Sequence, residues 1–289
     1  DGLFHLRGPR AAPAEVVVVS IDKASADRFG LPNEPRKWPR QLHARLVDNL
    51  SRAGAAVVAF DIHFEEPRDP AQDRLFVQAV RRAGNVVLFE QLKKETHHLT
   101  DAAGHRTGEV VIERRVPPFA ALAQAAAATA PFPLPKVPVK VSQFWLYKQG
   151  AGDAPTLPLV VWQLRTRADT VELLRLLRAA SPAAARSALD AEVMLREGNL
   201  RPFMETLRLL LRQPSLGAQV RAQLAADTAL SPATRKRLDA LVQVYQEGDS
   251  RYLNYYGPPH SITTLPYYEV WQVGAGPGAS VPDLRGKIV

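Results

Sequence analysis

The chain has 289 residues, of which 46% are hydrophobic and 23% charged, a composition typical of a globular protein large enough for one domain with an insertion. No apolar run approaches the roughly 18 residues that a membrane helix needs, and the absence of cysteine excludes disulfides, thiolate metal ligands and cysteine nucleophiles. A net charge of +8 would suit nucleic acid, but the Lys and Arg residues are scattered at helical spacing between Leu and Ala, so we expect solvated helix faces and no nucleic-acid partner.

Residues 1–90 repeat one pattern, in which a short apolar run is followed by a turn and an amphipathic helix. Such runs are typical of strands buried in a parallel sheet, and Gly54 and Gly84 fit the C-caps of the two helices. Right-handed crossovers between the strands then predict an α/β fold with a mostly parallel sheet and helices on both faces. The expected strands are 16–22, 57–64 and 86–89, and the expected helices are 39–53 and 69–83.

The next part of the chain is less regular. Residues 97–108 are polar and predict a loop, whereas 110–116 predict a strand and 119–130 an Ala-rich helix. The four prolines between positions 131 and 138 exclude a regular helix there. Pro158 fits the first turn of a helix over 157–165.

Strand patterns disappear between 169 and 249, where Leu/Ala/Arg helices follow one another. Their spacing varies too much for a tandem repeat, so we expect an inserted all-α helical bundle of about five helices. The α/β pattern resumes with 251–256, a short helix over 266–272 and a strand from Gly286. The α/β core is therefore expected to be split into 1–168 and 250–289, with the helical insertion at 169–249. Helix starts are expected at Asp169, Ser181, Pro202, Ser215 and Ser231.

Several segments, in fixed order, resemble the CHASE2 family of extracellular sensor domains. They are WPR at 38–40, FDIHFEEP at 60–67, RAGNVV at 82–87, YYGPP at 255–259 and the closing LRGKIV. The resemblance covers about the first ninety and the last forty residues and leaves the helical block without a counterpart.

The resemblance implies an extracytoplasmic ligand-sensing domain of a bacterial inner-membrane receptor, in the periplasm, flanked by transmembrane helices. It implies a cytoplasmic output domain, with an adenylate or guanylate cyclase favoured over a kinase, and no enzyme activity in this part. We expect both ends to continue in the native protein. We also expect an unknown small-molecule or ion ligand, a homodimer and no cofactor, with a divalent metal as an alternative.

Two aspartates follow the expected strands. Asp22 ends the first strand and Asp61 lies late in the second, and ligands of such sheets bind outside the carboxyl ends of the strands. Asp22 fits equally well as the N-cap of the following helix, and Asp61 as a hydrogen-bond partner of a loop or of an arginine.

His63 alternates with Asp61 along the expected strand, so these side chains share one side and, with Glu65, could ligate a divalent ion. The alternative is an exposed polar strand end.

Trp38, Arg40 and His43 open the first long helix, where they could meet the carboxylate or phosphate of a ligand. Packing of Trp38 and solvation of Arg40 are the alternative. Tyr256, in the returning strand, is a further candidate for ligand contact or for packing.

Two other functions remain open at this point. A Mg²⁺-dependent hydrolase could use Asp22 and Asp61, although the sequence has no P-loop, GxSxG, HExxH or dinucleotide-binding motif. A dimerisation or interaction module could use the helical insertion as its partner surface.

Overall fold

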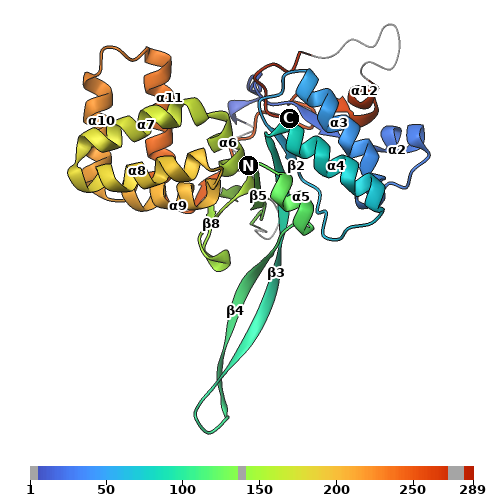
Figure 1. Ribbon diagram of the computed structural model, residues 1–289, viewed down its shortest axis with the longest axis horizontal. Coiled ribbons are helices and arrows are strands. Elements are labelled where there is room, and N and C mark those ends of the chain that lie inside the picture. The colour runs from blue at the N-terminus through green and yellow to red at the C-terminus, as the bar shows by residue number, and fades with distance from the viewer. Residues whose placement is uncertain (1–5, 136–140, 273–282) are drawn as a thin grey trace. The chain divides into compact units, whose positions relative to one another are not determined.

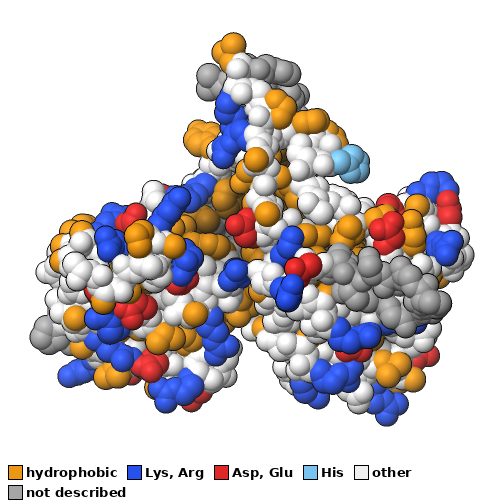
Figure 2. Space-filling view, turned by 90° about the horizontal axis from the view of Figure 1, so that it is seen from above, with side chains coloured by type: hydrophobic (Ala, Val, Ile, Leu, Met, Phe, Trp, Pro, Cys, Tyr) orange, Lys and Arg blue, Asp and Glu red, His pale blue; other side chains and the backbone are white. Residues whose placement is uncertain are grey.

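The computed structural model describes residues 6–135, 141–272 and 283–289 (Figure 1). The chain forms two compact units: unit 1 comprises Asp1–Phe144 with Tyr252–Val289, and unit 2 comprises Trp145–Arg251. No helix in the described ranges is long and apolar enough to cross a membrane. On the face that Figure 2 shows, Lys and Arg side chains are dispersed among acidic and hydrophobic ones.

Unit 1 carries the α/β part of the chain. Its elements are β1 (Val18–Ser20), α2 (Lys23–Phe29), η1 (Pro35–Lys37), α3 (Arg40–Arg52), β2 (Val58–Phe60), α4 (Pro70–Ala83), β3 (Val86–Thr100), β4 (Arg106–Val116), α5 (Ala120–Ala125), β5 (Ala128–Pro131), β10 (Thr264–Pro266) and α12 (Tyr267–Trp271). The chain passes between the units within β6 (Gln143–Trp145) and β9 (Ser250–Tyr252).

The strands of unit 1 join into one parallel arrangement through the last residues of the chain. β1 pairs with β10, β2 with β3, and β3 with β5, all in parallel. Ile288 forms parallel bridges to both Val16 and Val57. Val17 N–H donates to the Ile288 carbonyl at 2.9 Å, and Val289 N–H donates to the Val57 carbonyl at 2.9 Å. The strand order is therefore β10, β1, residues 287–289, β2, β3, β5.

The helices of unit 1 form a single layer, so among the described residues of this unit only one of the two expected helix layers is seen. Each helix packs against the next in the order α2, α12, α3, α4, α5. Apart from the return from β5 to β10 through unit 2, the parallel connections step across the sheet in the same direction, and the helices of unit 1 lie on one face of it (Figure 1). Val17 and Val19 pack in the core below them, whereas Val18 on the other face is 42% exposed.

Local sequence signals position the helices that cover the sheet. Asp69 caps α4 by accepting hydrogen bonds from the backbone of Ala71 and Gln72, as its sequence predicts, and α4 ends at Gly84 in the left-handed conformation. The apolar sides of α3 and α4 bury Val47, Leu50, Phe76 and Val80 against the sheet.

The second strand is shorter than expected. β2 pairs with β3 only over Val58–Phe60, opposite Val86–Leu88, and the chain leaves the sheet after Phe60. Asp61 and His63 therefore lie in the loop after the strand and not on one side of it. Phe64 turns back into the core, where it is fully buried and its carbonyl accepts from Phe119 N–H at 2.9 Å.

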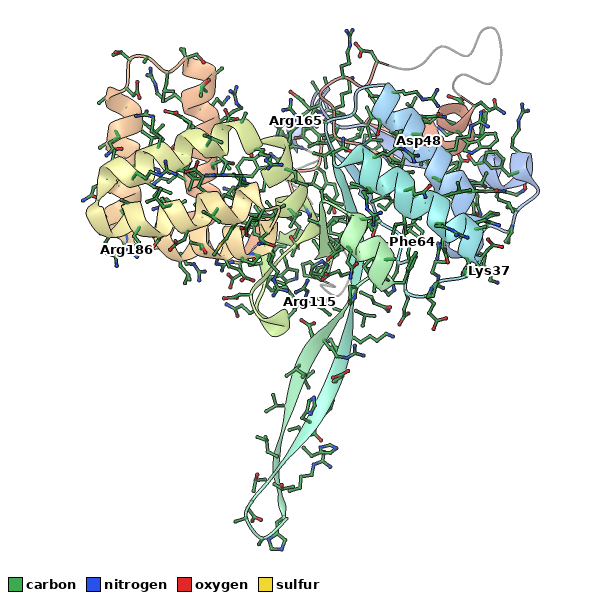
Figure 3. The ribbon with its side chains drawn as sticks, viewed as in Figure 1. Lys37, Asp48, Phe64, Arg115, Arg165 and Arg186 are labelled. Carbon is green, nitrogen blue, oxygen red and sulfur yellow. The ribbon has the colours of Figure 1, made fainter. Side chains whose placement is uncertain are left out.

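A two-stranded arm projects from unit 1 (Figures 1 and 3). β3 leaves the sheet and pairs antiparallel with β4 from Gln91 to Thr100. The expected loop over 97–108 is thus largely the outer part of this hairpin, and its turn is closed by Asp101, whose Oδ1 accepts from Ala103 and His105 N–H. The strands expected at 86–89 and 110–116 are confirmed but are longer, and because both faces of the arm are exposed its outer residues lack the apolar alternation that would have shown their full length.

The expected helix over 119–130 is split. α5 ends at Ala125, and Ala128–Pro131 pair with β3 as β5. Ala127 N–H donates to the Val86 carbonyl at 2.9 Å, so pairing with the sheet overrides the helix propensity of the alanines.

A buried ion pair fixes the root of the arm. Glu90 is 1% exposed and accepts two hydrogen bonds from Arg115, each of 2.6 Å. Thr129 of β5 donates to the same carboxylate. Arg115 lies where the arm leaves the unit (Figure 3), so this cluster joins β3, β4 and β5.

Unit 2 contains most of the helical residues and a small antiparallel pair, β7 with β8. α7 packs against α8, α10 and α11, and buries Leu173 and Leu177 with Phe203 of α9 and Leu238 of α11. Ser181 and Ser231 cap α8 and α11 as predicted. The bounds of unit 2 differ from the expected insertion at 169–249, because the unit already begins at Trp145. Its elements are β7 (Tyr147–Lys148), η2 (Gln149–Ala151), β8 (Ala154–Pro155), α6 (Leu157–Arg165), α7 (Arg167–Ala180), α8 (Pro182–Arg196), α9 (Leu200–Leu211), α10 (Pro214–Ala226) and α11 (Pro232–Gln246).

Gly54 gives a test of how tightly the C-terminal segment is packed. Its φ is +81°, and a Cβ at this position would lie 2.7 Å from Arg285 Cγ and 3.3 Å from Arg285 Cα. We expect Gly54→Ala to lower the free energy of unfolding by at least about 2 kcal/mol, through backbone strain plus displacement of Arg285. Gly84→Ala is the control, since φ is +65° there but the space is open. If denaturant unfolding shows that both variants lose the same free energy of unfolding, the close packing of Gly54 against Arg285 is contradicted.

The arm root gives a second prediction. Arg115→Met leaves the Glu90 carboxylate buried without its cation, and we expect a loss of about 3 kcal/mol in the free energy of unfolding at pH 7. Arg114→Met removes an exposed partner of Glu95 one position away and should cost less than about 1 kcal/mol. Chemical denaturation of both variants measures the difference, and similar small losses would show that the Glu90 pair does not secure the arm.

Candidate ligand-binding site

A polar cleft of about 300 Å³ lies in unit 1 beyond the carboxyl end of β2. Three segments form it: η1, the first residue of α3, and the loop that follows β2. This is the edge where open parallel sheets bind their ligands. The residues that line the polar cleft are Glu34, Arg36, Lys37, Arg40, His63, Glu65, Glu66 and Arg68.

Arg40 lies in the wall of the polar cleft with 3% of its surface exposed. Its guanidinium carbon lies 4.4 Å from the centre of the Phe64 ring, and its Nε lies 3.7 Å from Asp73 Oδ1, which is too long for a hydrogen bond. The pKa of Arg40 is lowered to about 10, mainly by burial and also by the nearby charge of Arg68, while Asp73 acts in the opposite direction. Arg40 remains a cation at neutral pH.

His43 lies one turn further along α3 and is completely buried. Its ring packs against Phe60, Phe64 and Phe76, and its Nδ1 lies 3.0 Å from the Tyr267 hydroxyl. Burial lowers the pKa of His43 to about 3, and the charges of Arg40 and Arg68 act in the same direction. The imidazole is therefore neutral and supports the polar cleft from within the core.

The loop after β2 connects the polar cleft to the root of the arm. His63 Nε2 lies 3.0 Å from the Val116 carbonyl at the end of β4, and the His63 ring packs edge-on against Phe89. Glu65 accepts a hydrogen bond of 2.5 Å from Lys93 of β3, which with His63 and Arg114 lowers the pKa of its carboxyl. The conformation of this loop is thus tied to the first residues of the arm.

Asp61 lies at the start of the same loop but does not line the polar cleft. Its side chain is exposed, although the surrounding chain removes part of its solvent and thereby raises its pKa. His63 is 3.8 Å from Glu65. Within the ranges that the structure describes, no group of three His, Asp or Glu side chains is arranged to hold a metal ion.

Two of the candidates from the sequence have structural roles. Asp22 caps α2, its Oδ1 accepting from Ser25 N–H at 2.8 Å. Trp38 is 1% exposed, packs edge-on against Phe29 and Tyr267, and donates from Nε1 to the Pro32 carbonyl at 2.8 Å. Asp22 therefore follows the capping alternative and Trp38 the packing alternative.

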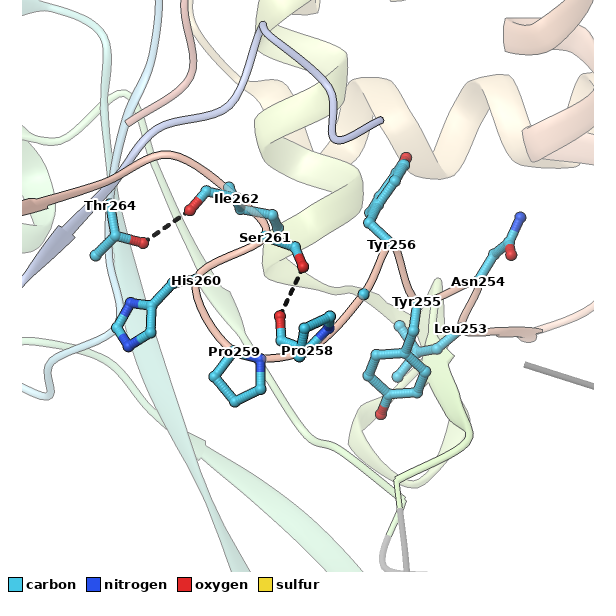
Figure 4. Close-up of a pocket in the computed structure, with 11 residues that line it drawn as sticks. Leu253, Asn254, Tyr255, Tyr256, Pro258, Pro259, His260, Ser261, Ile262 and Thr264 are labelled. Carbon is cyan, nitrogen blue, oxygen red and sulfur yellow. Dashed lines mark hydrogen bonds between the residues drawn. The ribbon is translucent and has the colours of Figure 1, made fainter. Parts of the chain in front are cut away.

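Tyr256 lines a different hollow of about 560 Å³, shown in Figure 4. One continuous segment, from Leu253 to Thr264, forms this hollow, and its lining includes no Asp, Glu, Lys or Arg. Ser261 Oγ donates to the Pro258 carbonyl at 2.7 Å, and the guanidinium carbon of Arg10 lies 5.4 Å from the centre of the Tyr256 ring. The structure therefore places Tyr256 in a separate apolar hollow and brings Arg40 and His63 together in the polar cleft.

The sequence did not single out Arg68, Phe64 or Tyr267 as parts of the site. Arg68 directly follows the FDIHFEEP segment, and its position soon after an expected strand is the sequence feature that could have identified it as a site residue. Phe64 was assigned to a strand, and its role under Arg40 depends on the turn that the chain makes after Phe60. Tyr267 comes from a part of the chain more than 200 positions away from its partner His43.

His43 predicts a pH dependence of stability. Its pKa is about 3 in the folded state, against 6.5 for the ordinary group, so only the unfolded chain gains the proton between these values. The contribution of the neutral His43 to the free energy of unfolding is therefore fully present above pH 6.5 and is lost as the pH falls towards 3. The loss amounts to at most about 1.4 kcal/mol per pH unit.

We expect His43→Gln to flatten the dependence of the unfolding free energy on pH between pH 6.5 and 4. His105→Gln, at the exposed tip of the arm, should leave the slope unchanged. Denaturant unfolding at several pH values measures both, and an unaltered slope in His43→Gln would refute the neutral buried imidazole.

Comparison with known proteins gives one match. The family model described as CHASE2 domain matches residues 1–289. The match thus runs through unit 2 as well as through the two segments of unit 1. No curated protein and no solved structure matches the chain significantly.

Proposed function

The chain belongs to the CHASE2 family, whose members are extracytoplasmic sensor domains of membrane signalling receptors, and we propose that it binds a small ligand outside the cytoplasm and relays that binding to a cytoplasmic output domain. The polar cleft carries this proposal. It is open to solvent, lies at the ligand-binding edge of a parallel sheet, and contains a buried cation whose hydrogen bonds are incomplete.

A path for the signal is supported by two connections of the cleft. The loop that forms one wall contacts the arm through Glu65 and His63. The same loop follows β2, and Ala59 of β2 and Val57 just before it form backbone hydrogen bonds with Val289. In the family, this end of the domain leads towards transmembrane helices, so a change at the cleft needs to pass only through β2 to reach it.

We favour a nucleotidyl cyclase as the output domain, with a protein kinase as the alternative. The support is the family resemblance alone. Both outputs are enzymes, whereas CHASE2 domains themselves are sensory.

The geometry gives less support to a Mg²⁺-dependent hydrolase. Asp22 follows β1 and Asp61 follows β2, and residues 287–289 lie between these strands. Two strand spacings amount to about 10 Å, while two carboxylates on one Mg²⁺ each approach it to about 2 Å. Asp22 is in addition engaged as the cap of α2.

The location of the domain can be tested with introduced cysteines, because the chain has none of its own. In the full-length receptor, Ala102→Cys at the exposed tip of the arm should react with a membrane-impermeant maleimide added to intact cells. Ala79→Cys is the matched control, since Ala79 is fully buried and should not react in the folded protein. Labelling of Ala102→Cys only after the cells are lysed would place the domain in the cytoplasm and refute the proposal.

A further inference from the structure

We propose that the polar cleft is a binding site for a small oxyanion, a carboxylate or phosphate group, held by Arg40, Arg68 and Arg36. This inference rests on the proposed sensing function and adds the chemical class of the ligand. Four observations support it: unsatisfied donors on a buried arginine, surplus positive charge around them, an uncapped helix N-terminus and a cleft of suitable size.

The first observation concerns the donors of Arg40. A guanidinium carries five N–H groups, and buried donors without acceptors are costly. In the described structure the Nε and Nη1 atoms of Arg40 have no hydrogen-bond partner, and neither has Asp73 Oδ1 beside them. Phe64 covers one face of the guanidinium, which fixes its plane. Arg40 also lines the cleft, so an oxyanion bound there would meet its guanidinium, whose planar fork suits carboxylate and phosphate.

The second observation concerns the charges at the rim. Glu34 is paired with Lys37 at 2.9 Å and Glu65 with Lys93 at 2.5 Å, so two of the three acidic residues that line the cleft are already neutralised. Arg36 and Arg68 are exposed at the rim, and only Glu66 remains to balance them among the residues that line the cleft. Arg68 and Arg40 line the same cleft, and the positive charge of Arg68 contributes to the lowered pKa of Arg40. A bound anion would relieve this repulsion.

The N-terminus of α3 also favours an anion in the cleft. Arg40 is the first residue of the thirteen-residue helix α3, whose N-terminus has no side-chain cap and no acidic residue in its first turn. The partial positive charge of this N-terminus is therefore not compensated from within α3, next to the cleft that Arg40 lines.

The size of the cleft limits the ligand. A volume of about 300 Å³ is at the lower end of the range for small-molecule sites. It suits a small carboxylic acid or phosphate ester better than a nucleotide or a peptide.

Titration calorimetry on the full chain tests this inference, with inorganic phosphate and acetate as probes and chloride at equal ionic strength as the reference. We expect at least one of the two oxyanions to bind, and the double variant Arg36→Ala with Arg68→Ala to weaken that binding at least about tenfold. Both side chains are exposed, so the variant should fold. Arg81→Ala is the control: it removes an exposed arginine in the last turn of α4, at the other end of the helix from Asp73, and should change the affinity less than about twofold.

Arg40→Lys provides a second measurement, because it keeps the charge but loses the planar fork. We expect it to weaken binding about tenfold while circular dichroism and the unfolding midpoint show a folded protein. If Arg40→Lys does not fold, the rim variants still decide the question.

The outcomes separate the possible ligands. Binding of phosphate alone assigns a phosphate-bearing ligand, binding of acetate alone a carboxylate-bearing one, and binding of both a general oxyanion site. The inference is overturned if neither probe binds at about 10 mM, or if binding persists unchanged in the Arg36/Arg68 double variant. That result would leave the maleimide labelling intact, because labelling reports where the domain lies and not what it binds.

Discussion

The architecture of unit 1 depends on the backbone hydrogen bonds of its last three residues. Lys287, Ile288 and Val289 exchange hydrogen bonds with residues next to β1 on one side and next to β2 on the other. Buried backbone groups must find such partners, and here they come from the most distant part of the sequence. Without this segment the β1–β10 pair and the β2–β3–β5 group would be separate sheets, and the helix layer above them would lose its common support.

The same segment decides which residues can form a site. It separates the carboxyl ends of β1 and β2, so Asp22 and Asp61 are held apart. Asp22 caps α2, and Asp61 begins the loop after β2. The polar cleft forms on the far side of β2, where the loop from Asp61 to Arg68 meets the first residue of α3. Arg40 becomes its central group because three elements contribute to its surroundings: Asp73 from α4, Phe64 from the loop, and its own helix.

The sequence predicted the features that depend on neighbouring residues. Caps at Asp69, Ser181 and Ser231 follow from hydrogen bonds that span two or three residues, and the alternation of strands and helices over 1–90 follows from short periodic patterns. The family resemblance was likewise carried by local motifs, and the family match confirms it.

Features set by distant partners were predicted less well. β2 ends where its pairing with β3 ends. β5 forms in place of the end of the expected helix because residues 127–131 hydrogen-bond and pair with β3 from Val86 onwards. The burial of Arg40 likewise could not be read from the WPR motif, since it results from packing against Phe64 and Asp73. A single sequence shows the charge of such a residue but not how much solvent reaches it.

The continuity of β3 has a mechanical consequence. One strand runs from the buried sheet at Val86 to the tip of the arm at Thr100, and no loop or glycine interrupts it. The ten residues beyond Glu90 span roughly 33 Å, and the Glu90–Arg115 pair holds the end of this strand that adjoins the sheet. Lys93 and Val116, at the root of the arm, contact the loop of the polar cleft, so the longest unsupported element of the unit begins beside the cleft.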